Sequence, residues 1–165
     1  MDLRSIQNPL KEKYRNDPSS SRITLKAYSD QTENPIACSV EVGQKIFEAQ
    51  AHSGVGGPGT AACSGDLLLG ALAACAQLTC QLVATAMGIP FEHIRVEVEG
   101  ELDLSGTLGV SKEVPVGFQG IHARFDVKAP DATAEQLAAL KEKTEQYCVI
   151  MQTLMKPPTI KSSWS

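Results

Sequence analysis

The feature that most constrains this chain is a stretch of residues 67–91 that carries no charged side chain. A stretch of that length is long enough to cross a bilayer. Its composition favours another role, because it is rich in alanine, and Gln77 and Gln81 would be costly to place in hydrocarbon. No aromatic or basic belt flanks it. The stretch therefore predicts a helix that is apolar almost all round and covered on most sides in the core of a soluble protein.

The flanks of the stretch set the ends of the predicted helix. Ser64 is a suitable N-cap residue, and Asp66 places a negative charge at the positive end of the helix dipole. Residues 88–90, with the sequence Gly-Ile-Pro, end the helix.

Alternating apolar and polar residues predict strands on both sides of this helix. The predicted strands are residues 22–28, 37–42 and 45–49 before it, and 93–104, 121–127 and 159–163 after it. A second helix opens with a capping box at Thr133 and Gln136, carries an apolar stripe as far as Met151 and ends at Pro157. Three strands in hairpin succession imply antiparallel pairing. The order β-β-β-α-β-β-α-β predicts the α+β class.

The length of 165 residues suits one domain or one half of an intertwined oligomer. Residues 5–15 predict a short charged helix, so we expect an N-terminal helical extension over residues 1–21 and the main domain over residues 22–165. A net charge of -4 without a basic block argues against a nucleic-acid-binding surface. No apolar stretch follows the charged start, so we expect no secretory signal and a cytoplasmic protein with reduced thiols.

Residues 54–59 contain the pattern GxGxxG, which in a dinucleotide-binding fold opens a helix and is followed by an acidic residue. Here Pro58 interrupts the pattern, the helix begins several residues later, and residues 67–91 contain no acid. We expect instead a flexible connection whose backbone approaches another group closely. Cysteine and histidine are not grouped at zinc-site spacings, so we expect no metal and no cofactor.

The five cysteines fall into two groups. Cys38, Cys63 and Cys80 are most simply small buried hydrophobes. Cys75 and Cys148 each lie on the apolar face of a predicted helix, and two such helices must pack together in a chain of this size. Two thiols within reach of each other form a redox pair, in which one attacks and the other resolves.

The sequence around these two cysteines resembles the OsmC/Ohr family of osmotically induced and organic hydroperoxide resistance proteins. The run SGDLLLGALAAC at residues 64–75 is similar to the start of that family's central helix. The run QYCV at residues 146–149 is similar to its second-cysteine helix. The strand order and the glycine-rich loop also agree, so the resemblance extends over roughly residues 22–163.

The resemblance implies an OsmC-like fold in an intertwined homodimer, with antiparallel sheets wrapped around long central helices. It also implies a cofactor-free thiol peroxidase that reduces organic hydroperoxides in defence against oxidative stress. Cys75 would be the peroxidatic residue and Cys148 the resolving residue. A dithiol reductant such as a lipoyl group would then reduce their disulfide. Neither nucleic acid nor a membrane is expected as a partner.

The chain departs from the family pattern at three places. Gly65 stands where family peroxidases have a Glu, residues 29–35 lack the family's Arg, and Val149 stands where Pro commonly follows the second cysteine. Cys75 lies more than two turns into its helix, too far for the helix dipole to lower its pKa much. We therefore expect a cation to stabilise the thiolate, with Arg22 and His52 as the candidates.

Three functions remain open. The first is the peroxidase, an enzyme of peroxiredoxin-type activity. The second is an OsmC-fold binding protein that lacks efficient peroxidase turnover and holds a small apolar ligand in the same cleft. The third is a thiol redox sensor, whose disulfide changes a partner interaction without turnover.

Overall fold

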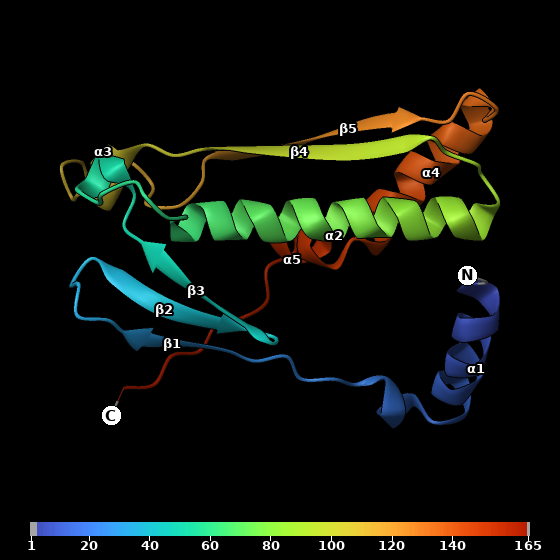
Figure 1. Ribbon diagram of the computed structural model, residues 1–165, viewed down its shortest axis with the longest axis horizontal. Coiled ribbons are helices and arrows are strands. Elements are labelled where there is room, and N and C mark those ends of the chain that lie inside the picture. Colours follow the sequence, from blue (N-terminus) through green and yellow to red (C-terminus); the bar gives the residue numbers. More distant parts are fainter. Residues whose placement is uncertain (1–2, 165) are drawn as a thin grey trace. The chain divides into compact units, whose positions relative to one another are not determined.

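The computed structural model describes residues 3–164 (Figure 1). By its internal contacts the chain divides into two compact units. Unit 1 comprises Met1–Leu69 and Gly100–Ile121, and unit 2 comprises Gly70–Glu99 and His122–Ser165.

Unit 1 contains a three-stranded antiparallel sheet, formed by β1 (Ala27–Gln31), β2 (Ala37–Val42) and β3 (Lys45–Gln50) in that order. The prediction of three hairpin strands is confirmed. The predicted boundaries of the first strand were wrong, because β1 begins five residues later than expected. The β1–β2 register places Ala27 opposite Val42, the last residue of β2. Residues 22–26 therefore extend beyond the end of the partner strand.

The helices of unit 1 outside α2 are short or lie at the N-terminus. They are α1 (Leu3–Asn16), the 3₁₀ helices η1 (Pro18–Ser21) and η2 (Ser53–Val55), and α3 (Leu104–Thr107). The predicted N-terminal helix is confirmed by α1. Asp17 caps η1, because its carboxylate accepts the Ser19 N–H at 3.1 Å. The α3 turn lies in the segment that the sequence marks as the connection between two strands.

The glycine-rich loop between β3 and α2 folds its backbone tightly onto itself. The Gly57 N–H donates to the His52 carbonyl at 3.0 Å. A Cβ placed on Gly57 would lie 1.6 Å from the Ala51 carbonyl oxygen, which is far inside van der Waals contact. Gly56 adopts a φ of 91°, which favours glycine. The expectation of a close backbone approach is confirmed.

Helix α2 (Ser64–Met87) runs from unit 1 into unit 2 and has the predicted length. Its predicted N-cap was wrong by one residue. Ser64 is the first helical residue, and the Cys63 carbonyl accepts the first helical hydrogen bond, from Leu67 N–H at 3.1 Å. Asp66 completes the cap, because its Oδ2 accepts the Cys63 N–H at 2.9 Å.

β4 (His93–Glu101) pairs with β5 (Gly120–Lys128), and most residues of both strands belong to unit 2. The pair is antiparallel, since Glu92 N–H donates to the Lys128 carbonyl and Gln119 N–H to the Glu101 carbonyl. The strands predicted in these two regions are confirmed. Both strands present apolar residues to α2, and the inward side chains include Ile94, Val96, Val98, Phe125 and Val127.

Helix α2 buries one narrow stripe, made of Leu72, Ala76, Cys80 and Ala84 at intervals of four residues. Leu78 and Leu82 are 58% and 45% exposed. The expectation of a helix covered on most sides is therefore wrong for a single chain. By length and composition alone α2 is able to cross a membrane, a test that core helices of soluble proteins also pass.

The predicted second helix is two helices, α4 (Ala134–Tyr147) and α5 (Val149–Met155). The capping box is confirmed, with Gln136 N–H on Thr133 Oγ1 at 3.2 Å and Thr133 N–H on Gln136 Oε1 at 2.8 Å. Continuity was the wrong prediction, because Cys148 has an extended ψ of 105° and serves as the C-cap of α4 and the N-cap of α5. The apolar stripe in the sequence is the same whether or not one residue within it is extended, so it does not predict the break.

The strand predicted at residues 159–163 is not formed in the described residues. Ile160 and Trp164 are 89% and 95% exposed. A strand requires a partner edge, and no edge of the described sheets pairs with this segment.

Replacing Gly57 by alanine is expected to lower the free energy of unfolding by about 1–3 kcal/mol, because the added Cβ collides with the Ala51 carbonyl. Urea denaturation followed by circular dichroism measures the change. Gly117→Ala is the control, since a Cβ there meets no atom within 4 Å. Equal stability of the two variants would contradict the close approach.

Candidate active site

The structure brings Cys75 and Cys148 together inside unit 2. Cys75 comes from α2 and Cys148 from the junction of α4 and α5, and the two thiols lie close enough for each to shift the pKa of the other. Both cysteines are free. They lie in one apolar cluster, whose partly buried members include Val96, Val98, Phe125, Ile150 and Met151. The two residues that the sequence singles out therefore form a contact pair.

The two thiols differ in how far a substrate can reach them. Cys75 is partly exposed, whereas Cys148 is fully buried at 0% exposure. A molecule that enters the site from solvent meets the sulfur of Cys75 first. Cys148 is closed to direct contact with solvent.

The pKa of Cys75 lies below its ordinary value, for reasons that do not involve a cation. Burial raises this pKa, but hydrogen bonds to the sulfur outweigh the effect of burial. The donors are the Ile150 N–H, the Cys148 thiol, the Thr79 hydroxyl and the Val149 N–H. These bonds strengthen when the sulfur is negative, so they favour the thiolate.

The pKa of Cys148 lies above its ordinary value. Burial is the main cause, and the neighbouring Cys75 raises it further. Hydrogen bonds from the N–H groups of Met151 and Ile150 act in the opposite direction and do not offset burial. The pair therefore holds its first negative charge on Cys75.

The break at Cys148 explains where the backbone donors come from. The first N–H groups of a helix have no partner within the helix. Because α5 begins anew at Val149, the N–H groups of Val149 and Ile150 are available to the Cys75 sulfur. These two donors were not predicted, because a continuous helix was expected. Thr79 was not predicted either, although it lies four residues after Cys75 and therefore on the same face of α2.

The two expected cationic residues lie in unit 1. Arg22 is exposed and follows η1, where its N–H donates to the Ser19 carbonyl at 3.2 Å. His52 precedes η2, and its Nδ1 accepts the Gly54 N–H at 3.0 Å. The charge of His52 also contributes to the lowered pKa of Asp66, although the Cys63 N–H is the main cause there. Neither residue is among the groups that shift the Cys75 pKa, and their role in thiolate stabilisation stays a prediction.

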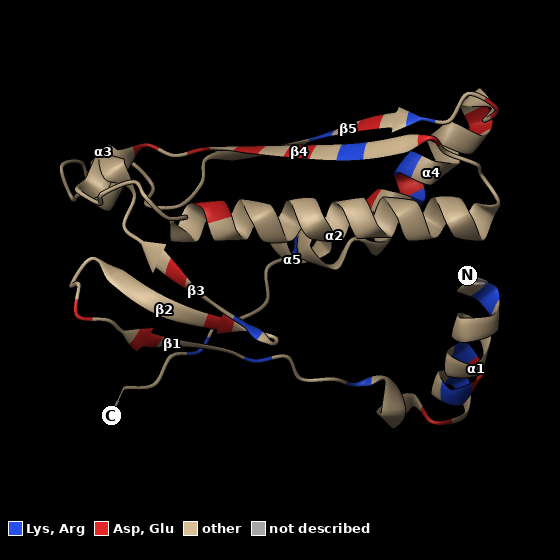
Figure 2. Cartoon of the chain, viewed as in Figure 1, with Lys and Arg blue, Asp and Glu red and all other residues tan. Residues whose placement is uncertain are grey.

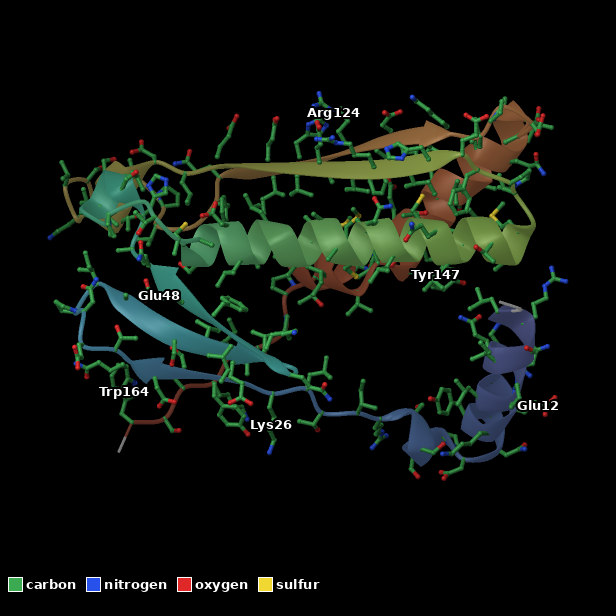
Figure 3. The ribbon with its side chains drawn as sticks, viewed as in Figure 1. Glu12, Lys26, Glu48, Arg124, Tyr147 and Trp164 are labelled. Carbon is green, nitrogen blue, oxygen red and sulfur yellow. The ribbon has the colours of Figure 1, made fainter. Side chains whose placement is uncertain are left out.

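The arginines of unit 2 face away from the thiol pair. Arg124 projects from β5 on the side of the sheet opposite α2 (Figure 3). It pairs with Glu97, which also binds Arg95 at 2.9 Å. Lys and Arg are absent from α2 itself, whose single charge is Asp66 (Figure 2). The immediate surroundings of Cys75 are apolar or neutral on these elements.

The other three cysteines differ in burial. Cys80 is 2% exposed, as expected for a small core residue, and burial raises its pKa. Cys38 and Cys63 are partly exposed, so the expectation of full burial was wrong for them in a single chain. Among residues 3–164, no three His, Cys, Asp or Glu side chains are grouped so that they could hold a metal ion.

The sequence profile described as OsmC-like protein matches residues 57–163. The chain belongs to this family. The matched region contains both cysteines of the pair, together with α2, β4, β5, α4 and α5. The resemblance stated from the sequence is therefore confirmed. No curated protein matches the sequence.

Solved structures share the OsmC-like fold. The OsmC-like protein of Mycoplasma pneumoniae is 16% identical, with a TM-score of 0.66 over 82% of this chain and 89% of that chain. The organic hydroperoxide resistance protein of Elizabethkingia anophelis is 18% identical, with a TM-score of 0.61 over 82% and 91%. An OsmC-like protein of unknown function from Vibrio cholerae is 15% identical, with a TM-score of 0.66 over 80% and 94%. The α+β, OsmC-like fold is confirmed.

Replacing Thr79 by valine removes one donor to the Cys75 sulfur and keeps the shape of the side chain. We expect alkylation of Cys75 by iodoacetamide at pH 7 to slow by about two- to tenfold, the scale of one hydrogen bond. Mass spectrometry of the Cys75 peptide over time gives the rate. Thr85→Val is the control, because that hydroxyl bonds the Gln81 carbonyl and not a thiol. Equal rates in both variants would contradict the role of Thr79.

Proposed function

We propose that this protein is a cysteine-based peroxidase that reduces organic hydroperoxides. The observation that carries the proposal is the asymmetry of the thiol pair. Cys75 is partly exposed and has a lowered pKa, whereas Cys148 is buried, has a raised pKa and lies against it in the same cluster. A peroxidase needs a nucleophilic thiolate that the substrate reaches and a second thiol held in reserve.

The reaction follows from these two positions. The Cys75 thiolate attacks the distal oxygen of the hydroperoxide, the O–O bond breaks, and the leaving alkoxide takes a proton and departs as an alcohol. Cys75 is then a sulfenic acid. The sulfur of Cys148 attacks the Cys75 sulfur, the S–O bond breaks, and water leaves as the disulfide forms. A dithiol of the lipoyl type returns two electrons and two protons and restores both thiols.

The surroundings of the pair favour substrates with apolar tails. The side chains packed around the two thiols are aliphatic, aromatic or thioether groups, including Val98, Phe125 and Met151. Such a lining gains free energy when it covers an apolar tail and gains little from hydrogen peroxide. The likeness to the organic hydroperoxide resistance protein of Elizabethkingia anophelis agrees with this substrate class.

The chain lacks the Arg and the Glu of the family pattern, but the Cys75 thiol has another means of forming a thiolate. Four neighbouring donor groups lower the pKa of Cys75 without a cation. The Cys148 thiol is one of them, so Cys148 acts on Cys75 before oxidation as a donor and after oxidation as the resolving nucleophile. We place this chemistry in the reducing cytoplasm, where a dithiol reductant is available.

We expect Cys75→Ser to abolish the reduction of cumene hydroperoxide, because it removes the attacking sulfur. Cys148→Ser is expected to leave the first oxidation of Cys75 intact, so that dimedone traps its sulfenic acid, while turnover with dihydrolipoate falls at least tenfold. Peroxide consumption and intact-protein mass spectrometry measure both effects. Cys63→Ser is the control and keeps wild-type turnover. Wild-type turnover in Cys75→Ser would end the proposal.

A redox sensor is the second candidate, because the same thiol contact also permits a disulfide without turnover. Mild peroxide treatment followed by mass spectrometry detects a Cys75–Cys148 disulfide in both cases. Repeated turnover with dihydrolipoate distinguishes the peroxidase from the sensor.

The uncovered face of α2 supports a homodimer. Leu78 and Leu82 lie on this helix and are 58% and 45% exposed. Exposed apolar side chains on a helix whose single charge is Asp66 are costly in water unless another surface covers them. We propose that a second copy of the chain covers this face.

Leu78→Glu is expected to dissociate the homodimer into monomers at micromolar concentration, since it places a charge in the proposed apolar contact. Multi-angle light scattering gives the mass. Leu78→Met keeps the apolar area and is expected to remain dimeric. A wild-type chain that is monomeric throughout the micromolar range would contradict the dimer.

A further inference from the structure

Unit 2 holds a cavity apart from the thiol pair. A cavity of about 580 Å³ lies between β5, α4 and the Cys80 side of α2. This volume falls in the range of small-molecule pockets in proteins. Neither Cys75 nor Cys148 lines it. Its apolar lining comprises Cys80, Phe125, Val127, Leu137 and Leu140.

One polar atom of the lining is buried and unsatisfied. Thr144 is 2% exposed, and its Oγ1 has no hydrogen-bond partner of normal geometry among residues 3–164. The Cys80 sulfur lies beside it, but sulfur is a weak acceptor. Buried hydroxyl groups almost always have a partner, because an unpaired one loses its hydration without compensation. The hydroxyl of Thr144 is therefore available to an oxygen atom of a bound molecule.

The charges near the cavity lie at its edge and balance one another. Lys141 and Glu145 on α4 are both exposed, as is His122 at the start of the β5 segment. Thr144, by contrast, is enclosed among apolar side chains. A carboxylate at Thr144 would lose its hydration without a buried cation to pair with, which is unfavourable. The polar group of a ligand at this depth is neutral.

We propose that this cavity binds a small neutral molecule with an apolar body and one hydroxyl or carbonyl oxygen, which pairs with the Thr144 hydroxyl. The apolar body covers Phe125, Val127 and Leu140, and the oxygen fills the vacant hydrogen-bonding position. The proposal concerns a site separate from the thiols and does not depend on the peroxidase activity.

Three probes of one shape test the proposal: 2-phenylethanol, ethylbenzene and phenylacetate. In the full chain, 2-phenylethanol is expected to shift the methyl signals of Val127, Leu137 and Leu140 in a ¹H–¹³C NMR titration. Phenylacetate is expected to bind at least tenfold more weakly, because its charge has no buried partner. Equal affinity for phenylacetate would overturn the neutral-ligand assignment.

Thr144→Val removes the hydroxyl and keeps the volume of the side chain. We expect it to weaken 2-phenylethanol about fivefold and to leave ethylbenzene unchanged or tighter. Thr85→Val, the same replacement outside the cavity, is expected to change neither. A loss of affinity that is equal for both probes would overturn the role of Thr144.

Leu137→Trp gives a second variant that does not touch Thr144. Leu137 is 38% exposed at the cavity, so a larger side chain there fills the space without entering the core. We expect it to abolish binding of 2-phenylethanol and ethylbenzene alike. Methyl signals that stay unchanged in the wild-type titration, as they would if a second copy of the chain filled the cavity, would overturn the proposal.

Discussion

The close packing of one narrow face of α2 is the constraint on which the rest of unit 2 depends. Ala76 and Ala84 are fully buried, and their small side chains let neighbouring elements approach the helix backbone. The Cys148 junction packs against Leu72 and Ala76 on this face. That approach brings two thiols, 73 positions apart in sequence, within hydrogen-bonding reach. A bulkier residue in place of Ala76 would separate them, because a packed interior has little spare volume.

The activation of Cys75 follows from a local defect in helical regularity. A continuous helix over residues 134–155 would use the N–H groups of Val149 and Ile150 in its own hydrogen bonds. The extended conformation of Cys148 frees them, and both contribute to the lowered pKa of Cys75. Neutral donors placed at short range in apolar surroundings stabilise a thiolate because there is little water to screen them. The same residue that supplies the resolving thiol thus also supplies, through its backbone, the geometry that ionises the attacking one.

Residue patterns predicted the elements well where local chemistry decides them. The limits of α2 to within one residue at its start, the capping box at Thr133 and the strand pairs all follow from periodicity, glycine and cap residues. The same patterns did not predict features that depend on tertiary contacts. The apolar stripe through Cys148 fits one continuous helix as well as two helices. The sequence therefore does not indicate the break at Cys148, nor the backbone N–H groups that the break makes available to Cys75. Thr79 lies four residues after Cys75 in the sequence, but the sequence does not indicate the direction of its hydroxyl group. The unsatisfied Thr144 was invisible for the same reason, since it occupies an ordinary place in an inward stripe.

The two sides of α2 differ in side-chain size and in burial. One side has mostly small residues, with Leu72 as the exception, and is buried by the sheet, α4 and the Cys148 junction of its own chain. Leu78 and Leu82, which remain exposed, are larger and would gain most from cover, because the free energy of burial rises with apolar area. Small side chains on the buried side let the Cys148 junction approach α2 closely enough for the two thiols to meet. Large side chains on the exposed side provide apolar area that a second surface would cover. A single copy of this chain leaves Leu78 and Leu82 of its central helix exposed, so the helix has an uncharged apolar face that only a second surface would cover.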